Sequence, residues 1–212
     1  MSPIYSALII LVIGFVLGYF AQRVQSSQNS SEALVRQTIQ NYFQSPNYHL
    51  LNHITLKHGS STTQIDHILV SRFGVFVIET KNYKGWIFAN ANQATWTQVL
   101  FKAKFKFQNP IHQNHRHVIA VRELLDFLPQ DAIKSVVVFI GDAEFKTDVP
   151  HGVYKLPFLI DYLKDCKEEL LSENRVQFAV GRIETARMAI SSKTDVEHVR
   201  ALQKRYGSKK FD

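Results

Sequence analysis

Two apolar stretches, residues 62–70 and 75–81, flank the short segment 71–74 and constrain the fold more than any other part of the chain. Stretches of this length that are rich in β-branched and aromatic residues, with Gly and Ser between them, are typical of two antiparallel strands joined as a hairpin. The hairpin is therefore expected to have buried faces, and any charged residue on it calls for an explanation.

The register of this hairpin can be predicted from its turn. If the turn is symmetric about residues 72–73, the numbers of paired residues sum to about 145. Asp66 then faces Glu79, and Gln64 faces Lys81. Directly opposed residues have Cβ atoms roughly 4.5–5.5 Å apart, and alternation puts Glu79 and Lys81 on one face of their strand. The sequence thus predicts one polar patch formed by these four residues.

Two opposed carboxylates repel each other, and one of them takes up a proton unless a cation lies between them. Mg²⁺ prefers oxygen ligands and is often held by one or two carboxylates together with substrate phosphate. Such an ion lowers the pKa of a bound water, and Lys81 would orient that water or stabilise developing negative charge. The alternative is a surface cluster of cross-strand salt bridges. The apolar residues around Asp66 and Glu79 favour a site.

The remaining periodicities predict an α/β domain built around a mixed sheet flanked by helices. A helix is expected to begin at a cap on Ser30 or Ser31 and to end before Ser45-Pro46. Further strands are expected at residues 48–56, 86–89, 95–107, 135–140 and 153–156, and further helices at 109–127, 157–171 and in the tail 181–206.

The N-terminal segment 4–20 contains 17 residues without a charge. As a helix it would cover about 25 Å, the short end of what spans a bilayer. It is expected to be a retained transmembrane helix, with a cleaved signal peptide or a buried core helix as alternatives. Arg23 and the basic remainder predict a cytoplasmic domain. The serine-rich segment 22–31 is interpreted as a linker.

Lys and Arg outnumber Asp and Glu by 25 to 18, which favours an anionic partner such as nucleic acid or an anionic lipid surface. The lysines at 102, 104 and 106 alternate with aromatic residues, and Lys102, Lys104, Lys106 and Lys84 are candidates for phosphate contacts. An amphipathic edge strand protected by lysines is the alternative. The single cysteine, Cys166, excludes a disulfide framework and a cysteine-based zinc site.

The sequence QIDHILVSRFGVFVIETKNYKG, followed by Trp96 and QNPIHQNHRH, resembles the nuclease-related domain family, NERD. That family is similar to the restriction-endonuclease-like superfamily named PD-(D/E)XK. The resemblance covers about residues 31–128 and is weaker as far as 163. It implies that Asp66 and Glu79 are metal ligands and that Lys81 is the catalytic lysine.

The resemblance also implies roles for two residues on helices. Glu32 matches the acidic residue of the family's first helix and would be a further metal ligand, unless it merely interacts with the helix dipole. Gln113 matches the family's later glutamine, on a helix face with His117. A metal site formed by His112, His115 and His117 is not expected, because helical spacing turns them in different directions.

The expected organisation is a transmembrane helix (4–20), a linker (22–31), a nuclease-like domain that resembles NERD (32–165) and a helical C-terminal extension (166–212). The expected function is that of a membrane-anchored nuclease that uses Mg²⁺ or Mn²⁺ and hydrolyses phosphodiester bonds of DNA, with RNA as the alternative substrate. A catalytically inactive nucleic-acid-binding module and a membrane-tethered adaptor protein are the alternatives.

Overall fold

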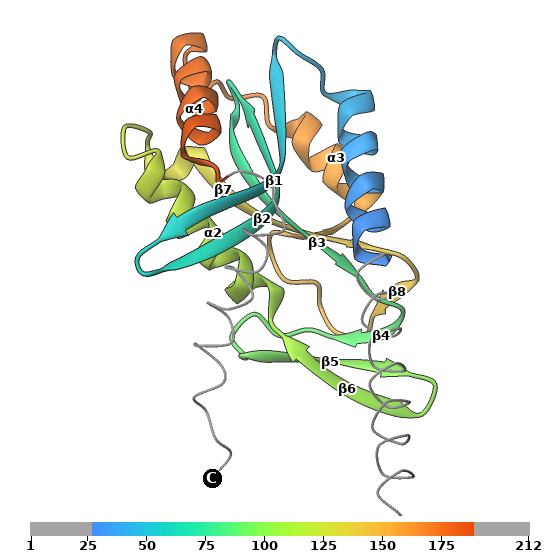
Figure 1. The fold of residues 1–212 in the computed structure, drawn as a ribbon. Helices are drawn as coiled ribbons and strands as arrows, with labels where there is room; N and C mark the ends of the chain where they lie inside the picture. The colour runs from blue at the N-terminus through green and yellow to red at the C-terminus, as the bar shows by residue number, and fades with distance from the viewer. Residues whose placement is uncertain (1–26, 189–212) are drawn as a thin grey trace, which may run out of the picture.

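The computed structural model describes residues 27–188 and shows a mixed five-stranded sheet with helices on both faces (Figure 1). The strand order is β1-β2-β3-β7-β9, in which β1–β2 and β2–β3 are antiparallel and β3–β7 and β7–β9 are parallel. The strands are β1 (Tyr48–His58), β2 (Ser61–Ser71), β3 (Gly74–Asn82), β7 (Ile133–Ile140) and β9 (Val153–Lys155). The predicted α/β class is confirmed.

The helices form two layers over this sheet. Residues 27–42 are helical and, with α3 (Leu156–Asp165), pack on one face through a core that includes Ile39 and Leu159. On the other face lie α2 (Pro110–Leu124) and α4 (Glu173–Ala186), whose Val121 and Ile183 share a second core. The short 3₁₀ helix η1 (Gln130–Ala132) leads into β7.

A second, four-stranded sheet lies beyond the end of β3, at the bottom of the view in Figure 1. Its order is β6 (Ala103–Gln108), β5 (Thr95–Leu100), β4 (Gly85–Phe88) and β8 (Ala143–Phe145). One face of this sheet contributes Ile87 and Trp96 to a third core with Phe139 of β7. The two sheets are therefore packed together through shared apolar side chains.

The segment predicted as one strand over 95–107 is a hairpin instead. Its turn lies at Phe101 and Lys102, and Phe101 has a left-handed φ of 55° and is 95% exposed. Phe105 is half-exposed, whereas Phe107 is partly buried and stacks on Tyr83 at 4.3 Å between ring centroids.

The helical boundaries also differ from the prediction. Residues 27–31, expected to be part of a linker, are already helical, and Ser31 donates to the carbonyl of Ser27 instead of capping the helix. α3 ends at Asp165, not at 171, and α4 packs into the main core through Val176, Ala179 and Ile183. No helix within residues 27–188 is long and apolar enough to cross a membrane. The predicted transmembrane segment 4–20 lies outside the described residues.

The site is positioned by the turn between β2 and β3 and by the N-terminal cap of α2. Gly74 closes the β2–β3 turn with φ of 136°, and a Cβ there would lie 2.9 Å from the carbonyl oxygen of Ala132. Asn109 caps α2, because its side chain accepts a hydrogen bond from the backbone N–H of Ile111. Its amide nitrogen donates to the carbonyls of Asn90, Ala91 and Gln93, which ties the start of α2 to the second sheet.

Candidate active site

The β2–β3 hairpin opens into a fork near its centre. Its ladder pairs His67 with Ile78 and continues in that register to the turn, as the sum of 145 predicts. The ladder does not extend past this pair: β2 continues beside β1, where Gln64 pairs with Thr55, and β3 continues beside β7. The prediction that Gln64 faces Lys81 is therefore wrong, and Asp66 and Glu79 are not ladder partners.

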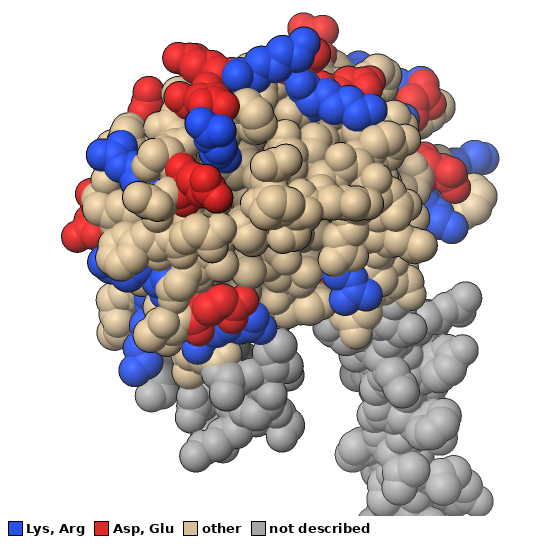
Figure 2. All heavy atoms as spheres, turned by 90° about the horizontal axis from the view of Figure 1, so that it is seen from above, with Lys and Arg blue, Asp and Glu red and all other residues tan. Residues whose placement is uncertain are grey.

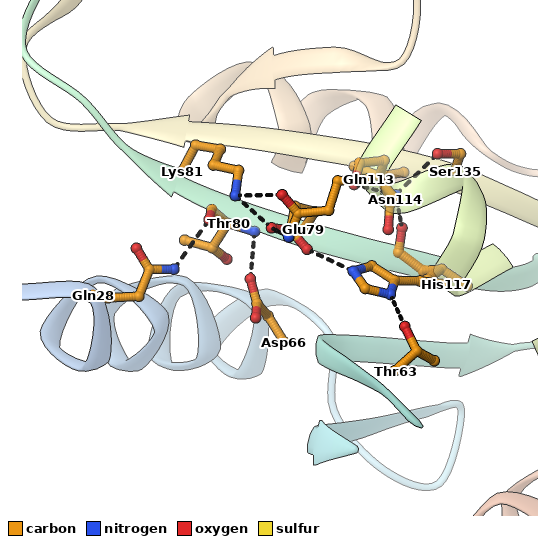
Figure 3. A network of polar contacts seen from close by, with 12 residues as sticks. Gln28, Thr63, Asp66, Glu79, Thr80, Lys81, Gln113, Asn114, His117 and Ser135 are labelled. Atoms are coloured by element: carbon orange, nitrogen blue, oxygen red, sulfur yellow. Dashed lines mark hydrogen bonds and ion pairs between the residues drawn. The ribbon is translucent and has the colours of Figure 1, made fainter. Parts of the chain in front are cut away.

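Asp66 lies in this fork and compensates for the lost strand pairing (Figure 3). Its Oδ2 accepts a hydrogen bond of 2.7 Å from the backbone N–H of Thr80. The carbonyl of Thr80 accepts from the Gln28 side chain at 3.1 Å. Backbone groups that lose their strand partner must be satisfied in another way. One side chain from β2 and one from the first helix thus complete the edge of β3.

Glu79 is held by three donors within the site. Its Oε1 accepts from Lys81 Nζ and from Gln113 Nε2, both at 2.6 Å, and its Oε2 accepts from His117 Nε2 at 3.1 Å. Gln113 Oε1 in turn accepts from Lys81 Nζ at 3.0 Å. Gln113 therefore binds both members of the Glu79–Lys81 ion pair and fixes their geometry.

His117 links Glu79 to β2. Its Nδ1 lies 2.6 Å from the hydroxyl oxygen of Thr63, and its ring is buried. Since the Glu79 carboxylate can only accept, we assign the His117 proton to Nε2, and the Thr63 hydroxyl donates to Nδ1. Next to His117 on the same helix, Asn114 donates to the carbonyls of Val77 and Val136. These bonds anchor α2 on β3 and β7.

The acidic residues of the site have opposite electrostatic environments. Burial raises the pKa of Asp66 well above its usual range, and the carboxylates of Glu79 and Glu32 raise it further. Burial also opposes the charge of Glu79, but Lys81 and His117 outweigh it and lower the pKa of Glu79. For Lys81, the Glu79 carboxylate outweighs burial and raises the pKa. The site therefore contains a stable ion pair beside a carboxyl group that is costly to ionise.

A polar cleft of about 470 Å³ opens over these side chains. It brings together the first helix, the β1–β2 hairpin, β3 and α2. Its lining comprises Gln28, Asn29, Glu32, His53, His58, Ser61, Thr62, Thr63, Gln64, Asp66, Glu79, Lys81, Gln108, Gln113, Arg116 and His117. All the predicted catalytic and metal-binding residues thus line one cleft, although Gln64 reaches it from the β1–β2 ladder.

The cleft contains the carboxyl groups of Asp66, Glu79 and Glu32, and carboxylate oxygens are the ligands that hard divalent cations prefer. One oxygen of Asp66 accepts a hydrogen bond from the backbone N–H of Thr80. Glu32 lies 3.2 Å from His53 Nδ1 and acts electrostatically on Asp66. Within residues 27–188, no three His, Cys, Asp or Glu side chains cluster closely enough to hold a metal by themselves. An ion here would therefore keep several waters, as Mg²⁺ usually does.

The other predicted residues lie elsewhere. Lys84, Lys104 and Lys106 are exposed on or beside the second sheet, Lys102 is exposed in the β5–β6 turn, and none of them lines the cleft. Of the three histidines near the start of α2, His117 alone enters the cleft. Sequence reasoning missed Thr63, His53, Gln28 and Arg116. The sequence did give a signal for His117, because its four-residue spacing from Gln113 puts both on one helix face.

Comparison with known proteins supports a nuclease-related origin for this arrangement. The chain matches the model of the nuclease-related domain family, NERD, over residues 27–140. It is similar to an uncharacterized protein of Bacillus anthracis, with 34% identity over 165 residues that cover 75% of this chain and 76% of the relative. No solved structure matches the chain significantly. The expected likeness to restriction endonucleases therefore stays a prediction.

Proposed function

This chain belongs to the nuclease-related domain family, and on that premise we propose that it is a divalent-metal-dependent nuclease that hydrolyses phosphodiester bonds, of DNA before RNA. The observation that carries the proposal is the environment of Asp66. A carboxyl group whose pKa is raised by burial and by two other carboxylates lies in an open cleft beside a charged lysine. Perturbed groups that converge in a cleft are typical of catalytic sites.

Asp66 and Glu79 would hold the Mg²⁺ or Mn²⁺ ion, with Glu32 beside them. When bound, the ion supplies an activated water and neutralises charge on the scissile phosphate. Glu79 keeps Lys81 protonated, so that Lys81 can donate a hydrogen bond to an oxygen on which charge develops. Gln113 and His117 hold Glu79 and Lys81 in place, which reduces the reorganisation needed during the reaction.

The test is cleavage by the full chain in detergent micelles. Labelled single-stranded and duplex DNA and RNA are incubated with Mg²⁺, with Mn²⁺ or with EDTA. Asp66→Ala and Lys81→Ala are expected to lose cleavage, whereas Asp142→Ala, at an exposed carboxylate outside the cleft, is expected to keep it. If no substrate is cut, or if Asp66→Ala cuts as fast as the natural chain, the proposal is wrong.

Binding without cleavage is a second candidate, favoured by the environment of Glu79. Its carboxylate already accepts three hydrogen bonds, so a metal ion must compete with the donors Lys81, Gln113 and His117. Retained nucleic-acid binding with no cleavage in any metal would support this second function.

We also propose that residues 4–20 anchor the protein in a membrane as a single-pass helix with the nuclease domain in the cytoplasm. The proposal rests on the uncharged run of 17 residues and on Arg23 after it. The full chain should stay in the membrane fraction after alkaline carbonate extraction, and a chain that starts at residue 24 should not. Protease added outside intact cells should leave the domain uncut. Extraction of the full chain by carbonate would contradict the anchor.

A further inference from the structure

Residues 80–122 form a long stretch without a carboxylate. This stretch contains seven Lys and Arg residues and no Asp or Glu, although the whole chain has 18 acidic residues. It covers the end of β3, three strands of the second sheet and most of α2. The basic excess of the protein is therefore concentrated at the second sheet and the cleft beside it.

The opposite end of the molecule differs in its charge pattern. Figure 2 views that end from above, and there the acidic and basic side chains are intermingled around a neutral centre. Mixed charges of this kind give little net attraction for a polyanion. The second sheet is thus the better candidate for contact with an anionic polymer.

The register of the second sheet puts two aromatic residues and two lysines on the same face. Trp86 pairs with Val99, which pairs with Lys104, and Phe88 pairs with Thr97, which pairs with Lys106. Paired residues in antiparallel strands point to one side of the sheet. We call Trp86, Phe88, Lys104 and Lys106 the aromatic–lysine face.

This face is exposed, whereas the opposite face is buried at Ile87 and Trp96 and half-exposed at Phe105. Trp86 is 49% and Phe88 40% exposed, and both lysines are exposed. The alternate residue Ile87 packs into the core between the two sheets. One acidic residue, Glu144 of β8, shares the row of Trp86, but it forms an ion pair with Lys146, whose Nζ lies 4.8 Å from the Trp86 ring centroid.

The aromatic–lysine face belongs to the sheet that adjoins the cleft. Gln108, the last residue of β6, lines the cleft together with Glu79 and Lys81. Lys106 lies two residues earlier on the same strand. A chain bound to the second sheet would thus lie close to the candidate catalytic side chains.

We propose that the aromatic–lysine face binds single-stranded nucleic acid and supplies it to the cleft. The inference rests on the proposed function and narrows its substrate. Exposed aromatic rings stack on unpaired bases, and lysines beside them bind successive phosphates without regard to sequence. A duplex offers no free base faces to Trp86 and Phe88, so single strands are preferred.

The test measures binding separately from cleavage. The full chain in detergent micelles is titrated in EDTA against fluorescein-labelled dT20, rU20 and a 20-base-pair DNA duplex, with fluorescence anisotropy as the readout. Vesicles of phosphatidylcholine and phosphatidylserine serve as a competing anionic surface. dT20 or rU20 should bind at least 10-fold more tightly than the duplex.

Two pairs of variants locate the binding surface. Trp86→Ala with Phe88→Ala should weaken dT20 binding by about 10-fold or more, because base–aromatic stacking contributes strongly to single-strand binding. Lys104→Gln with Lys106→Gln should reduce the slope of log K against log salt by about 1.4, or roughly 0.7 for each phosphate contact. The controls are Phe178→Ala on α4, which removes one exposed aromatic ring elsewhere, and the exposed pair Lys57→Gln with Lys167→Gln, which removes the same charge as the lysine pair of the face.

The outcomes separate this inference from the proposed nuclease activity. Binding of dT20 that both pairs of face variants weaken supports the inference, even when no substrate is cut with Mg²⁺. The inference is overturned by wild-type affinity in both pairs, by tighter binding of the duplex, or by binding to vesicles through these lysines without binding to dT20. Cleavage with unchanged binding in the variants would leave the nuclease proposal standing and reject this face.

Discussion

Asp66 lies at the point where the β2–β3 ladder ends. The residue types and the register were predictable, because the turn fixes the sum of the paired numbers and His67 does pair with Ile78. The end of the ladder was not predictable. It depends on two hydrogen bonds of the Thr80 backbone. The N–H of Thr80 donates to the Asp66 carboxylate, and the carbonyl of Thr80 accepts from the side chain of Gln28, which lies 52 residues away in sequence.

The raised pKa of Asp66 predicts a conflict between stability and function. A group whose pKa is raised in the folded state stabilises the fold while protonated and loses that contribution as pH rises through the raised value. Asp66→Asn keeps an acceptor for Thr80 and removes the charge. In EDTA at neutral pH its melting temperature should therefore exceed that of the natural chain, while cleavage falls at least ~100-fold because a metal ligand is lost. A lower melting temperature by calorimetry would contradict this account.

His67 has the opposite effect on the pH dependence of stability. Burial lowers its pKa to about 4, and its Nδ1 lies 2.7 Å from Asn52 Oδ1. Between pH 6.5 and 4 the unfolded chain binds the proton and the folded chain does not, so stability is lost as pH falls. In Asp66→Asn the free energy of unfolding should drop by roughly 3 kcal/mol over this range.

Urea titrations at several pH values measure this drop. Adding His67→Gln to Asp66→Asn should remove most of it, since glutamine does not titrate. An equal drop in both variants would assign the acid sensitivity to other groups.

At the scale of the elements, the sequence was most informative where periodicity and turn chemistry agree. The cap of α2 was predictable from Asn109-Pro110, and the buried strand β7 from its continuous apolar run. The β5–β6 hairpin was not, because its turn lies at Phe101 and Lys102 and contains neither Gly nor Asn. Alternating lysine and phenylalanine is compatible both with one long strand and with a short edge strand, so the pattern did not reveal the turn. Lys102 was therefore predicted on a strand although it lies in the turn.

Asn109 should be the most sensitive polar residue at an element boundary. Its side chain caps α2 and donates to three loop carbonyls, and it is fully buried. Asn109→Ala is expected to cost about 2–4 kcal/mol, because three loop carbonyls lose their donor together with the cap. Chemical denaturation measures the loss. The control Asn92→Ala, at an exposed position, should change stability by no more than about 0.5 kcal/mol.

For the whole molecule, the matched family region and the folding unit do not coincide. The family model ends at residue 140, but the core over β2 and β3 also includes Leu171, Val176 and Ile183. The sequence showed helical periodicity in the tail and gave no indication of what it packs against. Only the packed structure shows that α4 covers the same sheet face as α2.

Truncation tests this view of the folding unit. A chain that ends at residue 171 loses α4 and exposes the apolar side chains of its core partners, each worth about 1.5–3 kcal/mol when fully buried. It should lose the cooperative thermal transition seen by circular dichroism. A chain that ends at residue 188 should keep it. Ile183→Ala should cost about 2–5 kcal/mol, while Asn174→Ala, at an exposed position of α4, should be nearly neutral. A cooperative transition at wild-type temperature in the shorter chain would show that α4 is dispensable.

The contacts of Ser27 with Asn82 and of Gln28 with Thr80 have a consequence for the reach of the protein. They fix the start of the described chain directly beside β3, which carries Glu79 and Lys81. If residues 4–20 span a bilayer, the stretch from 20 to 27 would separate the domain from the membrane by at most about 25 Å at full extension. The cleft would then reach only a thin layer of cytoplasm along the membrane surface. Only nucleic acid that comes close to the membrane could enter the cleft. Its location in the cell would therefore restrict the substrates before any contact with a base or phosphate.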